Sequence, residues 1–235
     1  MRVTKMAAPL GAVIEDLDLR TVGGDEAARL NQLFGEHHVL VFPKQQLTPD
    51  EQIAFAQHWR DVNQHWHSDM TYAPTPPKLT MLYALEAPAI GGETAFANQI
   101  HAYEELSTGM KSLVDSLVAL HSAKDLARLY GQDPDQASEA EHPVVRTHDE
   151  TGQRALYVCG AFTRQFRDWS RQESKVLLDY LFEHCVRPEY QARHQWQAGD
   201  LVMWDNRCLL HYAVHDHGDE PRLIHRLQVR GVAPV

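Results

Sequence analysis

Two histidines and one aspartate have the spacing of a metal site. His67 and Asp69 form a His-x-Asp motif, and in an extended backbone side chains two residues apart point to the same side. His211 follows a strand-like apolar run much later in the chain and could supply a third ligand. Two histidines and one carboxylate on one face of an octahedron leave three positions open, which is typical of non-haem iron(II) oxygenases. The same residues could instead hold zinc and an activated water, as in a zinc hydrolase.

Two arginines follow His211 at a spacing that suits a bound anion. Arg222 and Arg226 are four residues apart on a predicted strand, so both guanidinium groups would lie on one face of it. A buried guanidinium needs a carboxylate, a sulfonate or a similar anion as its partner. The alternative is a row of surface arginines that includes Arg230, and the spacing alone does not decide between the two.

Three motifs extend this pattern over most of the chain. They are Trp66-His67-Ser68-Asp69-Met70-Thr71-Tyr72, then Gly91-Gly92-Glu93-Thr94, and then Trp204-Asp205-Asn206-Arg207 with His211, Arg222 and Arg226 after it. On these residues the sequence resembles the taurine dioxygenase/TfdA family of Fe(II)- and 2-oxoglutarate-dependent dioxygenases. The resemblance implies a double-stranded β-helix (jelly-roll) core. It also implies an oxidoreductase that hydroxylates its substrate with O2 while 2-oxoglutarate, the cosubstrate, is converted to succinate.

The resemblance assigns the cofactor contacts to individual residues. His67, Asp69 and His211 would bind Fe(II). 2-Oxoglutarate would chelate the iron through its 1-carboxylate and keto oxygen. Arg222 would pair with its distal carboxylate, and Thr94 would donate a hydrogen bond to that same carboxylate.

Three further positions match substrate contacts of the family. Arg226 corresponds to the arginine that holds a sulfonate or sulfate group, Asn63 to a substrate-contacting side chain, and Phe162 to an aromatic wall of the pocket. The implied substrate is a small anion, an alkyl sulfonate or alkyl sulfate, whose hydroxylation releases an aldehyde plus sulfite or sulfate. An aryloxyalkanoate or another carboxylic acid is the alternative substrate.

Two other classes of function were weighed against the dioxygenase. A zinc hydrolase built on the same three ligands would leave Arg222 and Thr94 without a purpose. A binding protein with a degenerate metal site would be expected to have lost a ligand, and all three are intact.

The sequence departs from the family in one place. The resemblance calls for a long segment, with a strand and substrate residues, between the helix that ends near Trp59 and the His-x-Asp motif, and here only a few residues separate them. Either the protein lacks this segment or residues are missing from the sequence at this point. The second alternative is favoured, because loss of the strand would open the pocket.

Hydrophobic periodicity and capping signals predict many short strands and a few helices. The predicted helices cover 24–36, 48–59, 101–106, 111–120 and 170–185, and the predicted strands cover 39–42, 79–85, 94–96, 144–145, 155–158, 190–196, 201–204, 209–214 and 223–229. Residues 131–141 are expected to form a loop. This pattern favours a mainly β fold with flanking helices, a jelly roll that forms one domain over residues 1–235.

Composition narrows the possible partners. The net charge is −10 and no run of Lys or Arg stands out, which argues against nucleic acid as a partner. No segment is apolar over enough residues to span a bilayer, so no membrane contact is expected.

The three cysteines, Cys159, Cys185 and Cys208, fit no zinc motif and suit a reduced cytoplasm. We expect a cytoplasmic protein that acts on a small organic anion, and the resemblance implies a homo-oligomer, either a dimer or a tetramer.

Overall fold

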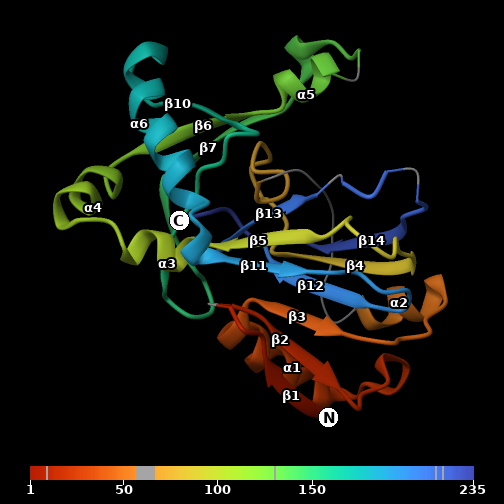
Figure 1. Ribbon diagram of the computed structural model, residues 1–235. Coiled ribbons are helices and arrows are strands. Elements are labelled where there is room, and N and C mark those ends of the chain that lie inside the picture. Colours follow the sequence, from red (N-terminus) through yellow and green to blue (C-terminus); the bar gives the residue numbers. More distant parts are fainter. Residues whose placement is uncertain (9, 57–66, 130, 215, 219) are drawn as a thin grey trace.

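Two β-sheets lie against each other at the centre of the protein (Figure 1). The computed structural model describes residues 1–235 except 9, 57–66, 130, 215 and 219. The larger sheet has, in spatial order, strands β1 (Arg2–Lys5), β2 (Ala12–Glu15), β3 (Val39–Phe42), β12 (Leu201–Asp205), β4 (Leu79–Glu86) and β14 (Leu223–Val229). The smaller sheet has β11 (Gln191–His194), β5 (Thr94–Asn98) and β13 (Leu209–Ala213).

Alternation along the strands divides the apolar side chains between two layers. Even-numbered residues such as Leu82 and Val202 pack with Phe96 and Leu209 of the smaller sheet, so they fill the space between the sheets. Odd-numbered residues of the same strands pack against helices α1 (Gly24–His37) and α2 (Pro49–Ala56) on the outer face. Because successive strand residues point to opposite faces, polar residues at even positions of β4 and β14 also enter the space between the sheets.

A third layer covers the outer face of the smaller sheet. It contains helices α3 (Gln99–Glu104), α4 (Thr108–Val114) and α6 (Arg171–Cys185), and a sheet of β10 (Thr163–Phe166), β6 (Val118–Ser122) and β7 (Glu139–Pro143). The strand pair β8 (Val145–Thr147) and β9 (Arg154–Leu156) lies beside α3, and α5 (Lys124–Leu129) follows β6. In the described part of the chain, the short 3-10 helices are η1 (Leu19–Thr21), η2 (Pro134–Gln136) and η3 (Pro188–Tyr190).

Most of the predicted elements are confirmed, including the helix that opens at Ser170. The Ser170 hydroxyl accepts from the N–H of Glu173, and the Glu173 carboxylate accepts from the N–H of Ser170, which is the capping box that the sequence indicated. The same reciprocal bonds join Thr48 and Glu51 ahead of α2. The mainly β fold class with flanking helices is therefore correct.

Two predicted boundaries are wrong. The helix expected over 111–120 ends at Val114, and residues from Val118 onward form β6, which pairs with β7 and β10. The loop expected over 131–141 contains η2 and the start of β7. In both cases pairing between strands distant in sequence overrides the local pattern. Among the described residues, no helix combines the length and the apolar character needed to cross a bilayer.

Candidate metal centre

Backbone pairing holds His67 and His211 next to each other. The N–H of His67 donates to the carbonyl of His211 at 3.1 Å, and the N–H of His211 donates back to the carbonyl of His67 at 3.0 Å. The chain turns directly after His67, and Met70 in this turn has a φ of 47°. The extended backbone expected for the His-x-Asp motif is therefore found at His67 only. The turn, rather than strand alternation, brings the Asp69 carboxylate next to the two imidazole rings.

The possible ligand atoms of the three residues converge. Oδ1 of Asp69 is 3.2 Å from Nε2 of His67 and 3.8 Å from Nε2 of His211. The ligand atoms of all three side chains lie within 4.8 Å of one another, and all three residues are buried. The structure thus brings together the three residues that the sequence predicted as a metal site.

The surroundings of Asp69 favour a bound cation. Its carboxylate is fully buried, Oδ2 accepts a hydrogen bond from the Thr80 hydroxyl, and Oδ1 accepts none from the part of the chain that the structure describes. Burial raises the pKa of Asp69 to about 8, and the Thr80 hydrogen bond and the charge of Arg226 only partly oppose it. A buried carboxylate keeps its charge when a cation lies beside it, and one carboxylate with two imidazoles suits a divalent transition metal. These residues therefore fit the predicted metal.

Arg222 and Thr94 both lie next to Trp196, with the Arg222 guanidinium 6.0 Å from the centroid of its ring. Nε of Arg222 donates to the carbonyl of Gly92 at 3.2 Å, while Nη2 is buried without a hydrogen-bond partner among the described residues. Nε1 of Trp196 donates to Oγ1 of Thr94 at 2.9 Å, which leaves the hydroxyl hydrogen of Thr94 for another acceptor. Burial lowers the pKa of Arg222, because it disfavours the charged guanidinium. A bound anion would offset this loss of solvation. A cation and a hydroxyl donor together suit a carboxylate.

Arg226 lies nearer the metal ligands. It is half-buried on β14, opposite Leu82 of β4, and its Nη1 is buried with no hydrogen-bond partner within the described ranges. Burial raises the pKa of both Asp69 and Tyr72, and the positive charge of Arg226 partly opposes this rise, so the guanidinium lies within electrostatic reach of the metal ligand. Burial lowers its own pKa. This arginine can therefore hold an anionic group next to the metal.

Two aromatic rings complete this side of the site. The ring of Phe162 meets that of His67 edge to face at 5.5 Å, and Tyr72 meets Phe162 edge to face at 4.9 Å. Phe162 is fully buried, as a pocket wall requires. Asn63, the remaining predicted substrate contact, lies outside the described residues.

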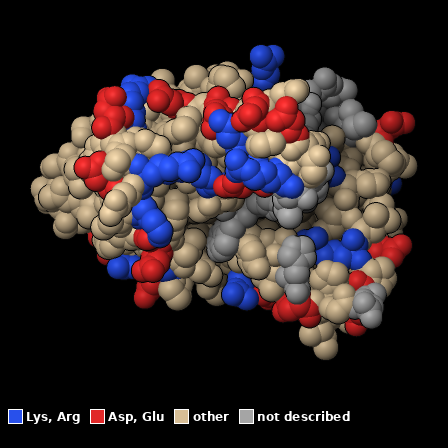
Figure 2. Space-filling model, turned by 90° about the horizontal axis from the view of Figure 1, so that it is seen from above, with Lys and Arg blue, Asp and Glu red and all other residues tan. Residues whose placement is uncertain are grey.

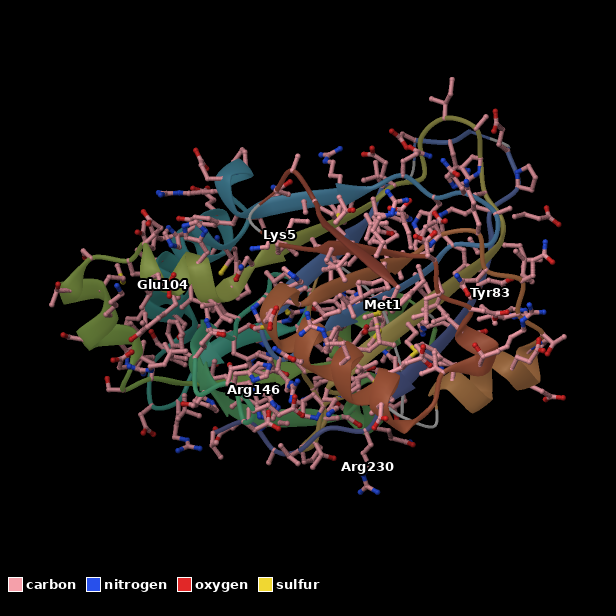
Figure 3. The ribbon with its side chains drawn as sticks, turned by 90° about the horizontal axis from the view of Figure 1, so that it is seen from below. Met1, Lys5, Tyr83, Glu104, Arg146 and Arg230 are labelled. Atoms are coloured by element: carbon pink, nitrogen blue, oxygen red, sulfur yellow. The ribbon has the colours of Figure 1, made fainter. Side chains whose placement is uncertain are left out.

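The alternative of a row of surface arginines does not hold. Arg230 is exposed and points away from the protein, as Figure 3 shows. Arg222 and Arg226 instead carry buried guanidinium nitrogens. Arg222 and Arg226 can therefore bind an anion, whereas Arg230, directly after β14, faces solvent.

A second cluster has metal-ligand residue types but different electrostatics. The possible ligand atoms of His148, Asp205 and Cys208 also lie within 4.8 Å of one another. Asp205, however, is already paired with the buried Arg207, whose Nε donates to Oδ1 at 2.9 Å and whose Nη2 donates to Oδ2 at 2.7 Å. Nε2 of His148 also lies 3.0 Å from Oδ2. Together these interactions lower the pKa of Asp205 strongly despite its burial. The carboxylate already has its counter-charge, so we assign this cluster to stability.

On the face seen from above, basic side chains form a band with acidic side chains beside it (Figure 2). A cleft between α5, β10 and α6 shows the same mixture, with ion pairs Lys124–Glu139 at 2.6 Å and Lys175–Asp179 at 2.5 Å on its walls. Basic side chains there are largely neutralised by acidic neighbours.

Several residues that contact the site were not singled out from the sequence. Trp196 donates a hydrogen bond to Thr94, and Thr80 donates one to Asp69. The ring of Trp204 packs against that of His211, with 4.5 Å between the ring centroids. Trp204 and Tyr72 were part of the quoted motifs without a role. Thr80 and Trp196 lie on strands that the sequence predicted, and alternation from a buried neighbour is the only signal that could have placed them inside.

Comparison with known proteins gives one family. Residues 58–228 match the family model described as "Taurine catabolism dioxygenase TauD, TfdA family". A taurine dioxygenase from Burkholderia xenovorans superimposes with a TM-score of 0.89 at 29% identity, covering 100% of this chain and 90% of that one. AAD-2 in complex with Mn(II) and N-oxalylglycine superimposes with a TM-score of 0.91 at 29% identity, covering 99% and 98%.

Three curated relatives are similar in sequence. An alkylsulfatase of Acinetobacter baylyi is 32% identical over 98% of this chain and 85% of its own length. An alpha-ketoglutarate-dependent sulfate ester dioxygenase of Pseudomonas putida is 39% identical over 72% and 60%. An alpha-ketoglutarate-dependent 2,4-dichlorophenoxyacetate dioxygenase of Cupriavidus pinatubonensis is 33% identical over 85% and 87%. The alignment with the alkylsulfatase has 271 positions, 36 more than the 235 residues of this chain, so that relative has segments without a counterpart here.

Proposed function

Because this chain belongs to the TauD/TfdA family of Fe(II)- and 2-oxoglutarate-dependent dioxygenases, we propose that it hydroxylates an alkyl sulfate or alkyl sulfonate whose anionic group is held by Arg226. Hydroxylation of the carbon that bears the sulfur oxyanion gives an unstable product, which breaks down to an aldehyde plus sulfate or sulfite. Family membership decides against the zinc hydrolase that the three ligands alone left open.

The observation that carries the substrate proposal is the buried Nη1 of Arg226, which has no hydrogen-bond partner among the described residues. A half-buried cation with such an N–H beside the metal ligands calls for an anion, and a sulfate or sulfonate oxygen accepts this bond well. Two of the similar proteins carry names that refer to sulfate esters. The sulfur oxyanion is therefore the first choice.

Each residue of the site then has a defined task. His67, Asp69 and His211 bind Fe(II), which when bound activates O2 together with 2-oxoglutarate. Arg222 pairs with the distal carboxylate of 2-oxoglutarate, and the Thr94 hydroxyl, oriented by Trp196, donates to the same group. Phe162 and Tyr72 exclude water from the space beside His67. Arg226 orients the target carbon by fixing the anion at a set distance from it.

A spectrum and a product assay test this proposal. Fe(II) and 2-oxoglutarate are added without O2 to the wild type, to His211→Ala, and to His101→Ala as a control on a partly exposed histidine. A visible charge-transfer band in the wild type and the control, absent in His211→Ala, is expected. Succinate is then measured with alkyl sulfates, alkyl sulfonates and aryloxyacetates. Fe(II) binding without the band in the wild type would refute the site assignment.

The alternative substrate is an aryloxyalkanoate. The Cupriavidus relative is named for 2,4-dichlorophenoxyacetate, and Arg226 could pair with a carboxylate as readily as with a sulfate. Succinate release with aryloxyacetates, without release with sulfates or sulfonates, would select this alternative.

The proposal extends to assembly and compartment. The enzyme is a homo-oligomer, a dimer or tetramer, of one-domain chains in the cytoplasm. In support, α6 exposes two large apolar side chains one turn apart, Val176 at 74% and Tyr180 at 41%. Light scattering on the purified protein measures the mass of the assembly, and a monomer would contradict this part.

A further inference from the structure

The Thr80 hydroxyl on β4 lies between the metal-binding carboxylate and two buried amides. Nδ2 of Asn206 donates to Oγ1 of Thr80 at 2.9 Å, and Nε2 of Gln228 donates to it at 2.7 Å. Oγ1 itself donates to Oδ2 of Asp69. All four side chains are buried, with at most 1% of each residue exposed. Water therefore does not compete for these bonds.

The direction of each bond follows from its neighbours. Trp204 Nε1 can only donate, and it donates to Oδ1 of Asn206 at 3.1 Å, so the Asn206 nitrogen must face Thr80. A hydroxyl oxygen has two lone pairs and one hydrogen. A metal-binding carboxylate can only accept, so the single hydrogen of Thr80 faces Asp69, and the amides of Asn206 and Gln228 donate to the two lone pairs.

We propose that Thr80 is the positioning residue for the Asp69 carboxylate, since it captures Oδ2 and leaves Oδ1 as the only oxygen that can reach the metal. This inference rests on the proposed function. Oδ1 is the atom that lies 3.2 and 3.8 Å from the two imidazole Nε2 atoms, and it accepts no hydrogen bond from the described residues. Asp69 thus binds through one oxygen.

One-oxygen binding determines how many positions stay open at the metal. Two histidines and one carboxylate oxygen fill three of six octahedral positions, which leaves two for 2-oxoglutarate and one for O2. A carboxylate that bound through both oxygens would fill a fourth position. The hydrogen bond from Thr80 opposes this, because it turns Oδ2 toward β4 and makes Oδ2 a weaker metal ligand.

The same network connects the metal ligand to the strand that carries Arg226. Gln228 is directly opposite Thr80 in the β4–β14 register, and Arg226 lies two residues earlier on the same face. One strand therefore supports both the Asp69 carboxylate, through Gln228 and Thr80, and the anion site of the substrate.

Metal affinity tests the proposal separately from turnover. Dissociation constants for Co(II) and Fe(II), with the anaerobic 2-oxoglutarate band, are measured for the wild type, Thr80→Val and Thr80→Ser. Valine keeps the shape and removes the hydroxyl, whereas serine keeps the hydroxyl. We expect affinity to fall about 10- to 100-fold in Thr80→Val and to stay within a few-fold of the wild type in Thr80→Ser.

A second variant covers the case in which Thr80→Val does not fold. Gln228→Met removes one amide donor without changing the length of the side chain, and a smaller loss of metal affinity, several-fold, is expected. Thr80→Val or Gln228→Met with lowered thermal stability but wild-type metal affinity would reduce Thr80 to a structural role and overturn the proposal. Absence of metal binding by the wild type would instead overturn the proposed function.

Discussion

Replacement of Arg226 by alanine should weaken the substrate and spare 2-oxoglutarate. The guanidinium is half-buried, its Nη1 has no hydrogen-bond partner among the described residues, and its charge acts on Asp69. Loss of one partner of a buried, hydrogen-bonded charge pair reduces the binding free energy by about 2 to 5 kcal/mol. Because Arg226 is partly exposed, we expect a value near the lower end of this range. A loss of about 2 to 3 kcal/mol corresponds to a fall of about 30- to 150-fold in kcat/KM for the sulfate or sulfonate.

The opposite pattern is expected for Arg222→Ala. That variant should raise the KM for 2-oxoglutarate by a similar factor and leave the KM of the sulfur substrate within a few-fold. Arg230→Ala is the matched control, because this arginine is exposed at the end of the same strand (Figure 3). Succinate formation is measured while one substrate is varied and the other is saturating. Equal losses in both KM values for Arg226→Ala would show that the two arginines do not have separate tasks.

Three further predictions concern the metal, the cosubstrate and pH. His211→Ala should abolish the anaerobic charge-transfer band and succinate formation, and normal turnover by this variant would exclude His211 as a ligand. Trp196→Phe keeps an aromatic side chain but removes the donor to Thr94, so the KM for 2-oxoglutarate should rise about 2- to 10-fold in steady-state assays, with the substrate KM unchanged. Burial lowers the pKa of His38 from 6.5 to about 4 in the folded protein. As pH falls, His38 is therefore protonated in the unfolded chain before it is protonated in the folded one. The free energy of unfolding should therefore drop by about 2 kcal/mol between roughly pH 7.5 and pH 5, and urea unfolding of His38→Asn should show less of this drop.

The metal and anion ligands were easier to predict from the sequence than the buried residues that hydrogen-bond to them. His67, Asp69 and His211 stand out because their residue types and spacing match a known chemistry. Arg222 and Arg226 follow from the same resemblance. Thr80 and Gln228 carry no such signal, since a threonine and a glutamine on buried strands are compatible with many roles. Their positions depend on the β4–β14 register, which long-range pairing sets.

Elements of the fold were likewise predicted where the signal lies in neighbouring residues and missed where it depends on pairing with distant strands. The helix from Arg171 to Cys185 was predicted because its capping box is encoded within four residues. Strand β6 was missed because Val118 to Ser122 follow a helix and have mixed polarity, and two partner strands from elsewhere in the chain make them extended. The N-terminal strands β1 and β2 were also missed, and of these only β2 has a distant partner, the parallel strand β3.

The backbone pairing of His67 with His211 has a consequence for the choice of metal. Two backbone hydrogen bonds place these two ligands side by side independently of any ion. Such a rigid site offers the same three donor atoms to every divalent metal of similar size, and intrinsic affinities then follow the usual order, in which copper, nickel and zinc exceed iron. Loading with iron is thus decided by which metals the cell supplies and in what amounts. We expect zinc or nickel to occupy the purified protein readily and to inhibit it.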